Sequence, residues 1–297
     1  MNTSIWSDFK RRWSSGDLVF RLLVINVVCF VVPFFVTGIA RLTGFDVPYL
    51  SWVALSSDAL TAATKPWTLL SYQFFHGNVL HLLFNSVMLF FTGQLFLTFF
   101  TQKQYLAVYL VGGIAAGLSF VGFYQLAGYT PNLLLGASAS VMAVLGAVTA
   151  YQPHYALRLA IFGNVKLWHI TLVLALLDVL QLGTGNFGGR LAHLVGLGFG
   201  WLYTVQLRNG VDLAGWMSSC IDWIGALFRP TEKQPFKSVH RNYKKANQAN
   251  TTKTSRIVVK DKTQVQIDAI LDKISSSGYD SLTEEEKTFL FNSGNKK

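Results

Sequence analysis

The amino-acid sequence predicts an all-α, polytopic membrane protein, on the basis of its composition and the placement of its charges. Hydrophobic residues make up 51% of the 297 residues and charged residues only 13%, against about 25% in soluble domains. Residues 18–207 contain ten of the charged residues, and the other 30 lie in the two ends of the chain. This distribution excludes a soluble enzyme with a charged surface. The net charge of +10 then indicates a basic tail, and nucleic acid is not an expected partner.

Six apolar runs predict helices that cross the membrane. A hydrocarbon core of about 30 Å requires about 20 apolar residues per helix. The predicted spans lie near residues 18–41, 78–100, 105–127, 137–153, 165–183 and 190–207. The fourth and sixth runs are short and rich in small residues, which is typical of central helices surrounded by other helices. We therefore predict a six-helix bundle over residues 18–207.

The N-terminal segment, residues 1–17, is predicted to be cytoplasmic because it contains Lys10, Arg11 and Arg12. The first apolar run is long and has no small-residue cleavage site, so it predicts a retained helix and not a signal peptide. With six spans, the basic tail returns to the same side as the N-terminus. Both termini are thus expected in the cytoplasm.

The longest predicted loop, residues 42–75, contains Trp52, Trp67 and several apolar residues. Tryptophan is enriched where a bilayer meets water. We expect this loop to lie partly in the interface, and an unstructured connector is the alternative.

The sequence after the sixth span predicts three further parts. Residues 208–228 have apolar side chains at helical spacing, which predicts an amphipathic helix in the membrane interface; a seventh span would move the basic tail across the membrane, against the charge rule. Residues 229–262 predict a basic disordered linker attracted to membrane lipids, with nucleic-acid binding as a weak alternative. Residues 263–297 predict a cytoplasmic helical hairpin, in which Gly278 ends the first helix and Thr283 and Glu286 form a capping box.

The two cysteines, Cys29 and Cys220, form neither a disulfide framework nor a set with metal-ligand spacing. No metal and no cofactor are expected.

Three clusters of polar residues lie in or beside the predicted spans, where an unpartnered polar group is costly. The first contains His76, His81 and Asn85. His81 and Asn85 are four residues apart and share one face of the second span, while His76 precedes that helix near the outer interface. Each could act chemically, or simply hydrogen-bond to neighbouring helices.

The other two clusters lie on the short fourth and sixth spans. Gly136 and Ser138 open the fourth span, where free backbone amides of the first helical turn are available. His193 is followed by Gly196 and Gly200, a small-residue face that allows another helix to approach closely. If that helix is the Ser138 helix, a nucleophile and a base come within hydrogen-bonding distance.

Together the clusters predict an acyl-transfer site. Ser138 would attack a carbonyl, His193 would take and return the proton, and His81, Asn85 and the Ser138 amide would stabilise the oxyanion. No carboxylate is expected to orient His193. Asp178 is the acidic residue well inside a span, and a packing or folding role is favoured for it, so the sequence predicts a catalytic dyad.

Over about residues 18–207 the sequence resembles the rhomboid intramembrane serine proteases. The resemblance rests on P66-W67 leading into H76, on H81-xxx-N85, on G136-x-S138, and on A192-H193-xx-G196-xxx-G200, in the order found in that family. It implies a six-helix rhomboid fold, a Ser138–His193 dyad reached from the outer side, and transmembrane-helix proteins as substrates. Residues 211–228 and 263–292 are similar to an extension of a bacterial subgroup, which implies the bacterial inner membrane.

The resemblance also gives roles to individual residues. It implies that His81 and Asn85 lie on the oxyanion side, that Gly136 precedes the nucleophile, and that Gly196 and Gly200 form the close-packing face. Ala139, Met142, Thr68 and Gln94 depart from the commonest pattern.

Two other functions are consistent with these residues. A catalytically silent relative would bind transmembrane helices in the same groove. A transporter would use the polar residues as a path, but neither inverted repeats nor charges at successive depths are evident. The sequence does not identify a partner for the tail.

Overall fold

The computed structural model describes residues 4–159, 163–183, 185–227 and 262–294. The chain divides into two compact units, residues 1–231 and residues 232–297. Most of the predicted basic linker, residues 229–261, lies outside the described residues.

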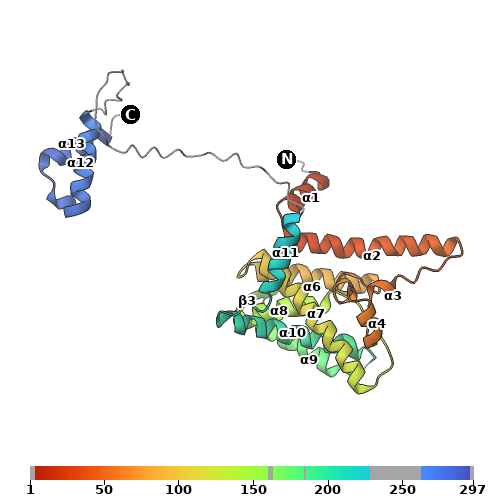
Figure 1. The fold of residues 1–297 in the computed structure, drawn as a ribbon. Helices are drawn as coiled ribbons and strands as arrows, with labels where there is room; N and C mark the ends of the chain where they lie inside the picture. The colour runs from red at the N-terminus through yellow and green to blue at the C-terminus, as the bar shows by residue number, and fades with distance from the viewer. Residues whose placement is uncertain (1–3, 160–162, 184, 228–261, 295–297) are drawn as a thin grey trace, which may run out of the picture. The chain divides into compact units, whose positions relative to one another are not determined.

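The first unit contains six helices that match the six predicted runs in order (Figure 1). They are α2 (Leu18–Leu42), α6 (Val79–Leu97), α7 (Gln102–Ala127), α8 (Ser138–Tyr151), α9 (Leu167–Leu180) and α10 (Phe187–Arg208). By length and composition α2, α6 and α7 can each cross a membrane, and α8 and α9 are shorter apolar helices. The predicted fold class, a polytopic helical bundle, is confirmed.

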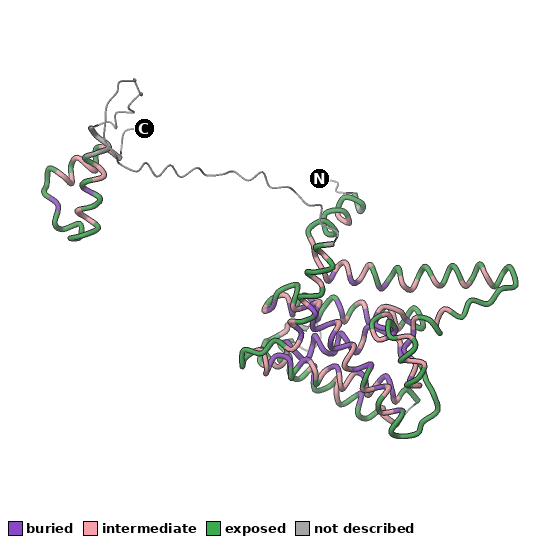
Figure 2. The backbone as a smooth tube through the Cα atoms, viewed as in Figure 1, coloured by how far each residue is buried: buried purple, intermediate pink, exposed green. Residues whose placement is uncertain are grey.

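Helix α8 lies at the centre of this bundle. Every residue from Ala139 to Val148 is buried, and α6, α7, α9 and α10 all pack against the helix. Figure 2 shows the buried residues gathered there, whereas α2 is mostly exposed along its length. Helix α2 packs on α6 and buries only Val19, Leu22 and Asn26. Its remaining apolar surface is therefore available to lipid.

Glycines allow α8 and α10 to pack with their backbones in direct contact. A β-carbon at Gly196 would overlap the carbonyl oxygen of Ala139, and one at Gly200 would overlap that of Ala143. From the other side, a β-carbon at Gly146 would overlap the carbonyl oxygen of Leu197. Small residues at helical spacing are what permits such a close approach.

The loop between α2 and α6 is ordered, so the alternative of an unstructured connector is wrong. It contains α3 (Leu50–Val53), β1 (Leu55–Ser56), α4 (Ala59–Thr64), α5 (Thr68–Ser71) and a 3-10 turn, η1 (Tyr72–Phe74). Trp67 stacks on Trp52 and its Nε1 donates to the Trp52 carbonyl at 2.8 Å. The Tyr72 hydroxyl donates to the Gly113 carbonyl at 2.6 Å, which fastens the loop to α7.

Strand β1 also joins this loop to the segment that leads into α8. It pairs antiparallel with β2 (Leu133–Leu134), placing Leu55 opposite Leu134. The chain then reaches the start of α8 after three residues. The loop and the beginning of α8 are thus held together by backbone hydrogen bonds.

Helix α1 and a hairpin between α8 and α9 are among the elements that were not predicted from the sequence. In helix α1 (Ile5–Ser14) the rings of Trp6, Phe9 and Trp13 stack in one row. This segment is too short and too basic to be predicted as a membrane span. Strands β3 (Ala156–Leu159) and β4 (Gly163–Lys166) form a hairpin between α8 and α9. The hairpin lies in the connection between the fourth and fifth predicted spans, for which the sequence predicted no structure.

Helix α11 (Gly215–Leu227) lies within the predicted amphipathic segment and packs against α7. Its Met217 is buried, whereas Trp216 and Trp223 are exposed. The Asp222 carboxylate accepts a hydrogen bond from Lys103 at 2.8 Å.

The second unit contains α12 (Lys262–Ser277), a 3-10 turn, η2 (Tyr279–Ser281), and α13 (Glu284–Gly294). Gly278, with φ +78°, follows α12. Both hydrogen bonds of the predicted capping box are present: the Glu286 amide donates to Thr283 Oγ1 and the Thr283 amide to Glu286 Oε2. Glu286 also pairs with Lys273 of α12 at 2.9 Å, which ties the two helices together.

Candidate active site

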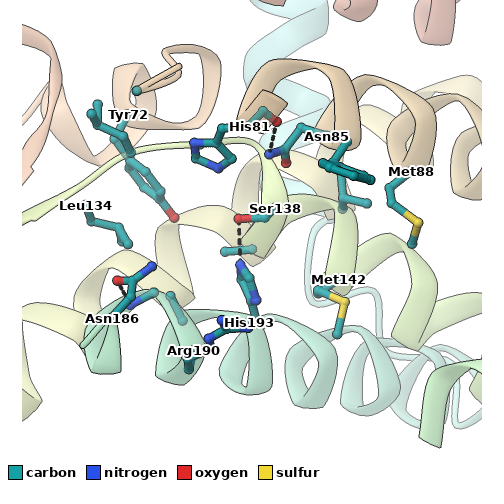
Figure 3. A pocket seen from close by; sticks show the side chains of 18 of the residues that line it. Tyr72, His81, Asn85, Met88, Leu134, Ser138, Met142, Asn186, Arg190 and His193 are labelled. Atoms are coloured by element: carbon teal, nitrogen blue, oxygen red, sulfur yellow. Dashed lines mark hydrogen bonds between the residues drawn. The ribbon is translucent and has the colours of Figure 1, made fainter. Parts of the chain in front are cut away.

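A cavity of about 450 Å³ opens between α6, α8, α10 and the segment around β2. Its lining contains four of the predicted site residues that carry polar side chains, namely Ser138, His193, His81 and Asn85 (Figure 3). The structure therefore brings the three separate sequence clusters to one place.

Ser138 and His193 face each other across this cavity. Ser138 is the first residue of α8, and His193 lies in the second turn of α10. The Ser138 Oγ and the His193 Nε2 are 2.7 Å apart (Figure 3). His193 is three residues before Gly196, so the glycine that lets α10 touch Ala139 also brings the imidazole to the serine.

Gly136 makes the turn that leads into α8. Its φ of +119° lies in the region that disfavours residues with a side chain. A β-carbon there would also lie 2.7 Å from the His81 ring. The Gly136 amide donates to the Tyr72 carbonyl at 2.9 Å, which fixes the turn. Glycine is thus required both by the backbone conformation and by the closeness of His81.

The N-terminal end of α8 provides backbone donors beside Ser138. Ala137 precedes the helix without a side-chain cap, and the first helical hydrogen bond runs from the Val141 amide to the Ala137 carbonyl. The amides of the preceding turn have no acceptor within the helix. An anion formed next to Ser138 would meet these amides and the positive end of the helix dipole.

The predicted oxyanion residues lie on α6, on the opposite side of the cavity from α10. The His81 ring lies against Gly136. The Asn85 side-chain amide donates to the His81 carbonyl at 2.9 Å, and its second N–H hydrogen is not used in that bond. Asn78 caps α6 by accepting from the His81 amide at 2.8 Å, which fixes the start of this helix.

The prediction that no carboxylate is placed to orient His193 was wrong. Both Asp178 carboxylate oxygens lie 3.1 Å from His193 Nδ1, and Arg190 Nη1 lies 3.1 Å from Asp178 Oδ1. Asp178 is near the end of α9 and His193 near the start of α10, so an antiparallel pair of helices with a short connection places them at one level. An ionisable residue inside a predicted span was the signal available in the sequence.

Comparison with known proteins identifies the family. Residues 63–210 match the family model described as the rhomboid domain. The chain belongs to the rhomboid family. Residues 258–292 match a second model, described as a family of unknown function.

Two curated rhomboid relatives are distant in sequence. The chain is 27% identical over 202 residues to presenilin-associated rhomboid-like protein A, mitochondrial, of Danio rerio, covering 67% of this chain and 49% of that protein. It is 29% identical over 136 residues to RHOMBOID-like protein 4 of Arabidopsis thaliana, covering 46% of this chain and 32% of that protein. The chain thus spans about half or less of the length of these rhomboids.

Two of the rhomboid positions that depart from the commonest pattern lie at the cavity. Ala139 and Met142 both line it. The Ala139 carbonyl oxygen is the atom against which Gly196 packs. Met142 lies one helical turn beyond Ser138, so a flexible apolar side chain borders the serine there.

His76 lies beside this rhomboid site and does not line the cavity. It precedes α6, in the connection after η1, and is 2% exposed. Its ring makes an edge contact with the His81 ring at 5.2 Å between centroids. Burial, and secondly the neighbouring His81, lower the pKa of His76 to about 4. His76 therefore enters the folded protein as a neutral side chain.

The low pKa of His76 makes folding stability depend on pH. The unfolded chain binds a proton at this side chain near pH 6.5, whereas the folded chain binds it near pH 4. The contribution of His76 to the free energy of unfolding is therefore complete above the pKa of the unfolded chain and is lost as the pH falls toward the pKa of the folded chain. Between about pH 7 and pH 5 the loss is about 2 kcal/mol. Denaturant unfolding of the wild type and His76→Gln at both pH values should show the smaller change in the variant. An equal change in the free energy of unfolding of both proteins would contradict a role for His76. His154 is exposed, so His154→Gln is the control variant.

Proposed function

We propose that the protein is an intramembrane serine endopeptidase that hydrolyses peptide bonds of transmembrane substrates. The observation that carries the proposal is the 2.7 Å separation of Ser138 Oγ and His193 Nε2 inside a cavity of the helical bundle. Membership of the rhomboid family supports it, because that family is associated with serine protease chemistry.

The first half of the proposed reaction is acylation. Ser138 Oγ attacks the carbonyl carbon of the scissile peptide bond, and His193 Nε2 accepts the hydroxyl proton. The carbonyl oxygen becomes an oxyanion, stabilised by the amides at the start of α8 and by donors from His81 and Asn85. Collapse of this intermediate breaks the C–N bond, and His193 returns the proton to the leaving amine.

The second half is hydrolysis of the acyl-enzyme. A water molecule attacks the ester carbon while His193 accepts one of its protons. The C–O bond to Ser138 then breaks, the proton returns to Ser138 Oγ, and the new carboxyl terminus leaves. The cavity, with polar residues on two sides, is a suitable place for that water.

The substrate is proposed to be a transmembrane helix that unwinds near its outer end. A peptide carbonyl in a regular helix is hydrogen-bonded and shielded, so helix-destabilising residues would favour its entry into the cavity. The proposed location is the bacterial inner membrane, with both termini in the cytoplasm and the cavity reached from the opposite side.

The proposed activity is tested by reconstituting the purified wild-type protein in liposomes with fluorogenic substrates that each contain one transmembrane helix. We expect cleavage at a single region near the outer end of the helix, found by mass spectrometry of the products. Binding without cleavage over several substrates would overturn the proposal in favour of a catalytically silent protein that binds transmembrane helices.

The proposed oxyanion role of α6 gives a second expected result. Removing a donor side chain in His81→Ala or Asn85→Ala should lower kcat by about 10²–10³, because one charge-stabilising hydrogen bond is lost. Met88 lines the same cavity without a strong donor, so Met88→Ala is the matched control and should keep kcat within about threefold. Equal losses in all three variants, measured in liposomes, would contradict an electrostatic role for the α6 side chains.

A further inference from the structure

We infer that Asp178 is a positioning residue for His193 and that Arg190 holds its carboxylate ionised and in place. The inference rests on the proposed function and extends it, because it adds a third and a fourth side chain to the serine and histidine. The sequence favoured a dyad, and the contacts of α9 with α10 support a longer chain of hydrogen bonds.

Both nitrogens of the His193 ring are engaged. Nε2 lies 2.7 Å from Ser138 Oγ, and Nδ1 lies 3.1 Å from each oxygen of Asp178. A carboxylate can only accept, so the proton of a neutral imidazole is held on Nδ1. Nε2 is then left with its lone pair toward the serine hydroxyl, which is the tautomer that general-base catalysis requires.

Arg190 explains how a carboxylate is kept charged at this place. Asp178 is 5% exposed, and a buried carboxylate is costly unless it is paired. Arg190 Nη1 lies 3.1 Å from Asp178 Oδ1, and Nη2 donates to the side-chain oxygen of Gln181. The guanidinium is thereby held by two acceptors, Asp178 and Gln181, which both lie near the end of α9.

The spacing along α10 connects these contacts. Arg190 and His193 are three residues apart and lie on one face of the helix, so a single carboxylate can meet both. Before the reaction, Asp178 and Arg190 offset each other's charge. When His193 accepts the serine proton, the carboxylate lies directly beside the new positive charge and stabilises it.

A purely structural role is the rival explanation. In that case the Asp178 and Arg190 pair would only fasten α9 to α10, and its loss would reduce stability and activity together. The two explanations differ for a variant in which both side chains are replaced by neutral partners of similar shape. A neutral amide pair can keep the two helices together without providing a carboxylate for His193.

The experiment compares wild type, Asp178→Asn, Asp178→Glu and the double variant Asp178→Asn with Arg190→Gln, as full-length proteins in liposomes. We measure kcat and KM for a cleaved transmembrane substrate, the unfolding temperature, and the rate of labelling by a fluorophosphonate. Asp222→Asn is the matched control, because it removes a carboxylate that also pairs with a cation, Lys103, but lies far along the chain on α11.

We expect Asp178→Asn to lower kcat by about 10²–10⁴ with KM changed less than about threefold, since the imidazole proton is no longer held on Nδ1. Asp178→Glu should recover part of kcat, and the double variant should recover the unfolding temperature while kcat stays low. Wild-type kcat in Asp178→Asn, or recovery of kcat along with stability in the double variant, would overturn the inference alone. A wild type that neither cleaves nor reacts with the fluorophosphonate would overturn the proposed function and this inference with it.

Discussion

Purified Ser138→Ala and His193→Ala proteins are expected to lose cleavage of a transmembrane substrate by at least about 10⁴-fold. The serine provides the attacking oxygen, and the imidazole 2.7 Å away accepts its proton. Removing either one leaves the other without a function, so the double variant should be no less active than each single variant. The measurement is turnover in liposomes, with the unfolding temperature recorded for each protein.

Ser140 provides a matched control for that result. It lies two residues after Ser138 on α8, is buried, and its Oγ donates to the Gln73 side-chain oxygen at 2.9 Å. Ser140→Ala should lower the unfolding temperature modestly, because a buried acceptor loses its partner, and it should retain cleavage. Cleavage retained by Ser138→Ala would contradict the assignment of the nucleophile.

The largest effect on folding is expected from Gly200→Leu. The β-carbon of the leucine would overlap the Ala143 carbonyl oxygen, a backbone atom of α8. Because a backbone atom cannot move aside as a flexible side chain can, α8 and α10 must separate, at a cost of about 3 kcal/mol or more. We expect the unfolding temperature to fall by about 10 °C, and cleavage to be lost because Ser138 and His193 are on the two separated helices.

Gly198 on the same helix separates this effect from a general response to glycine replacement. A β-carbon at Gly198 would have no neighbour within 4 Å, apart from the backbone of its own helix. Gly198→Leu should therefore keep both the unfolding temperature and the activity. Equal losses for the two leucine variants would show that the contact between α8 and α10 does not limit stability.

The parts of the fold that depend on local pattern could be predicted from the sequence. An apolar run of about 20 residues forms a helix when it crosses a bilayer. The six predicted runs correspond in order to α2 and α6 to α10. The spacing of Gly196 and Gly200 predicted a close helix contact, and the resemblance to rhomboid proteases implied that the partner helix carries Ser138. The capping box of Thr283 and Glu286 is local and was found for the same reason.

Features that depend on distant contacts were missed. The pairing of β1 with β2 joins Leu55 to Leu134, and no local pattern marks so short a strand. Asp178 was assigned a packing role because its distance to His193 depends on how α9 and α10 are aligned, which the sequence does not specify. Arg190 is the first residue of the sixth predicted span, and no local pattern indicates that its guanidinium contacts Asp178.

Covalent labelling decides whether Ser138 is a nucleophile that His193 activates. The purified protein is treated with a fluorophosphonate in liposomes, digested, and mapped by mass spectrometry, beside Ser138→Ala and His193→Ala. We expect one adduct, on Ser138 of the wild type, none in Ser138→Ala, and labelling slowed by about 10²-fold or more in His193→Ala. No adduct in the wild type, or an adduct on another residue, would contradict this role of Ser138.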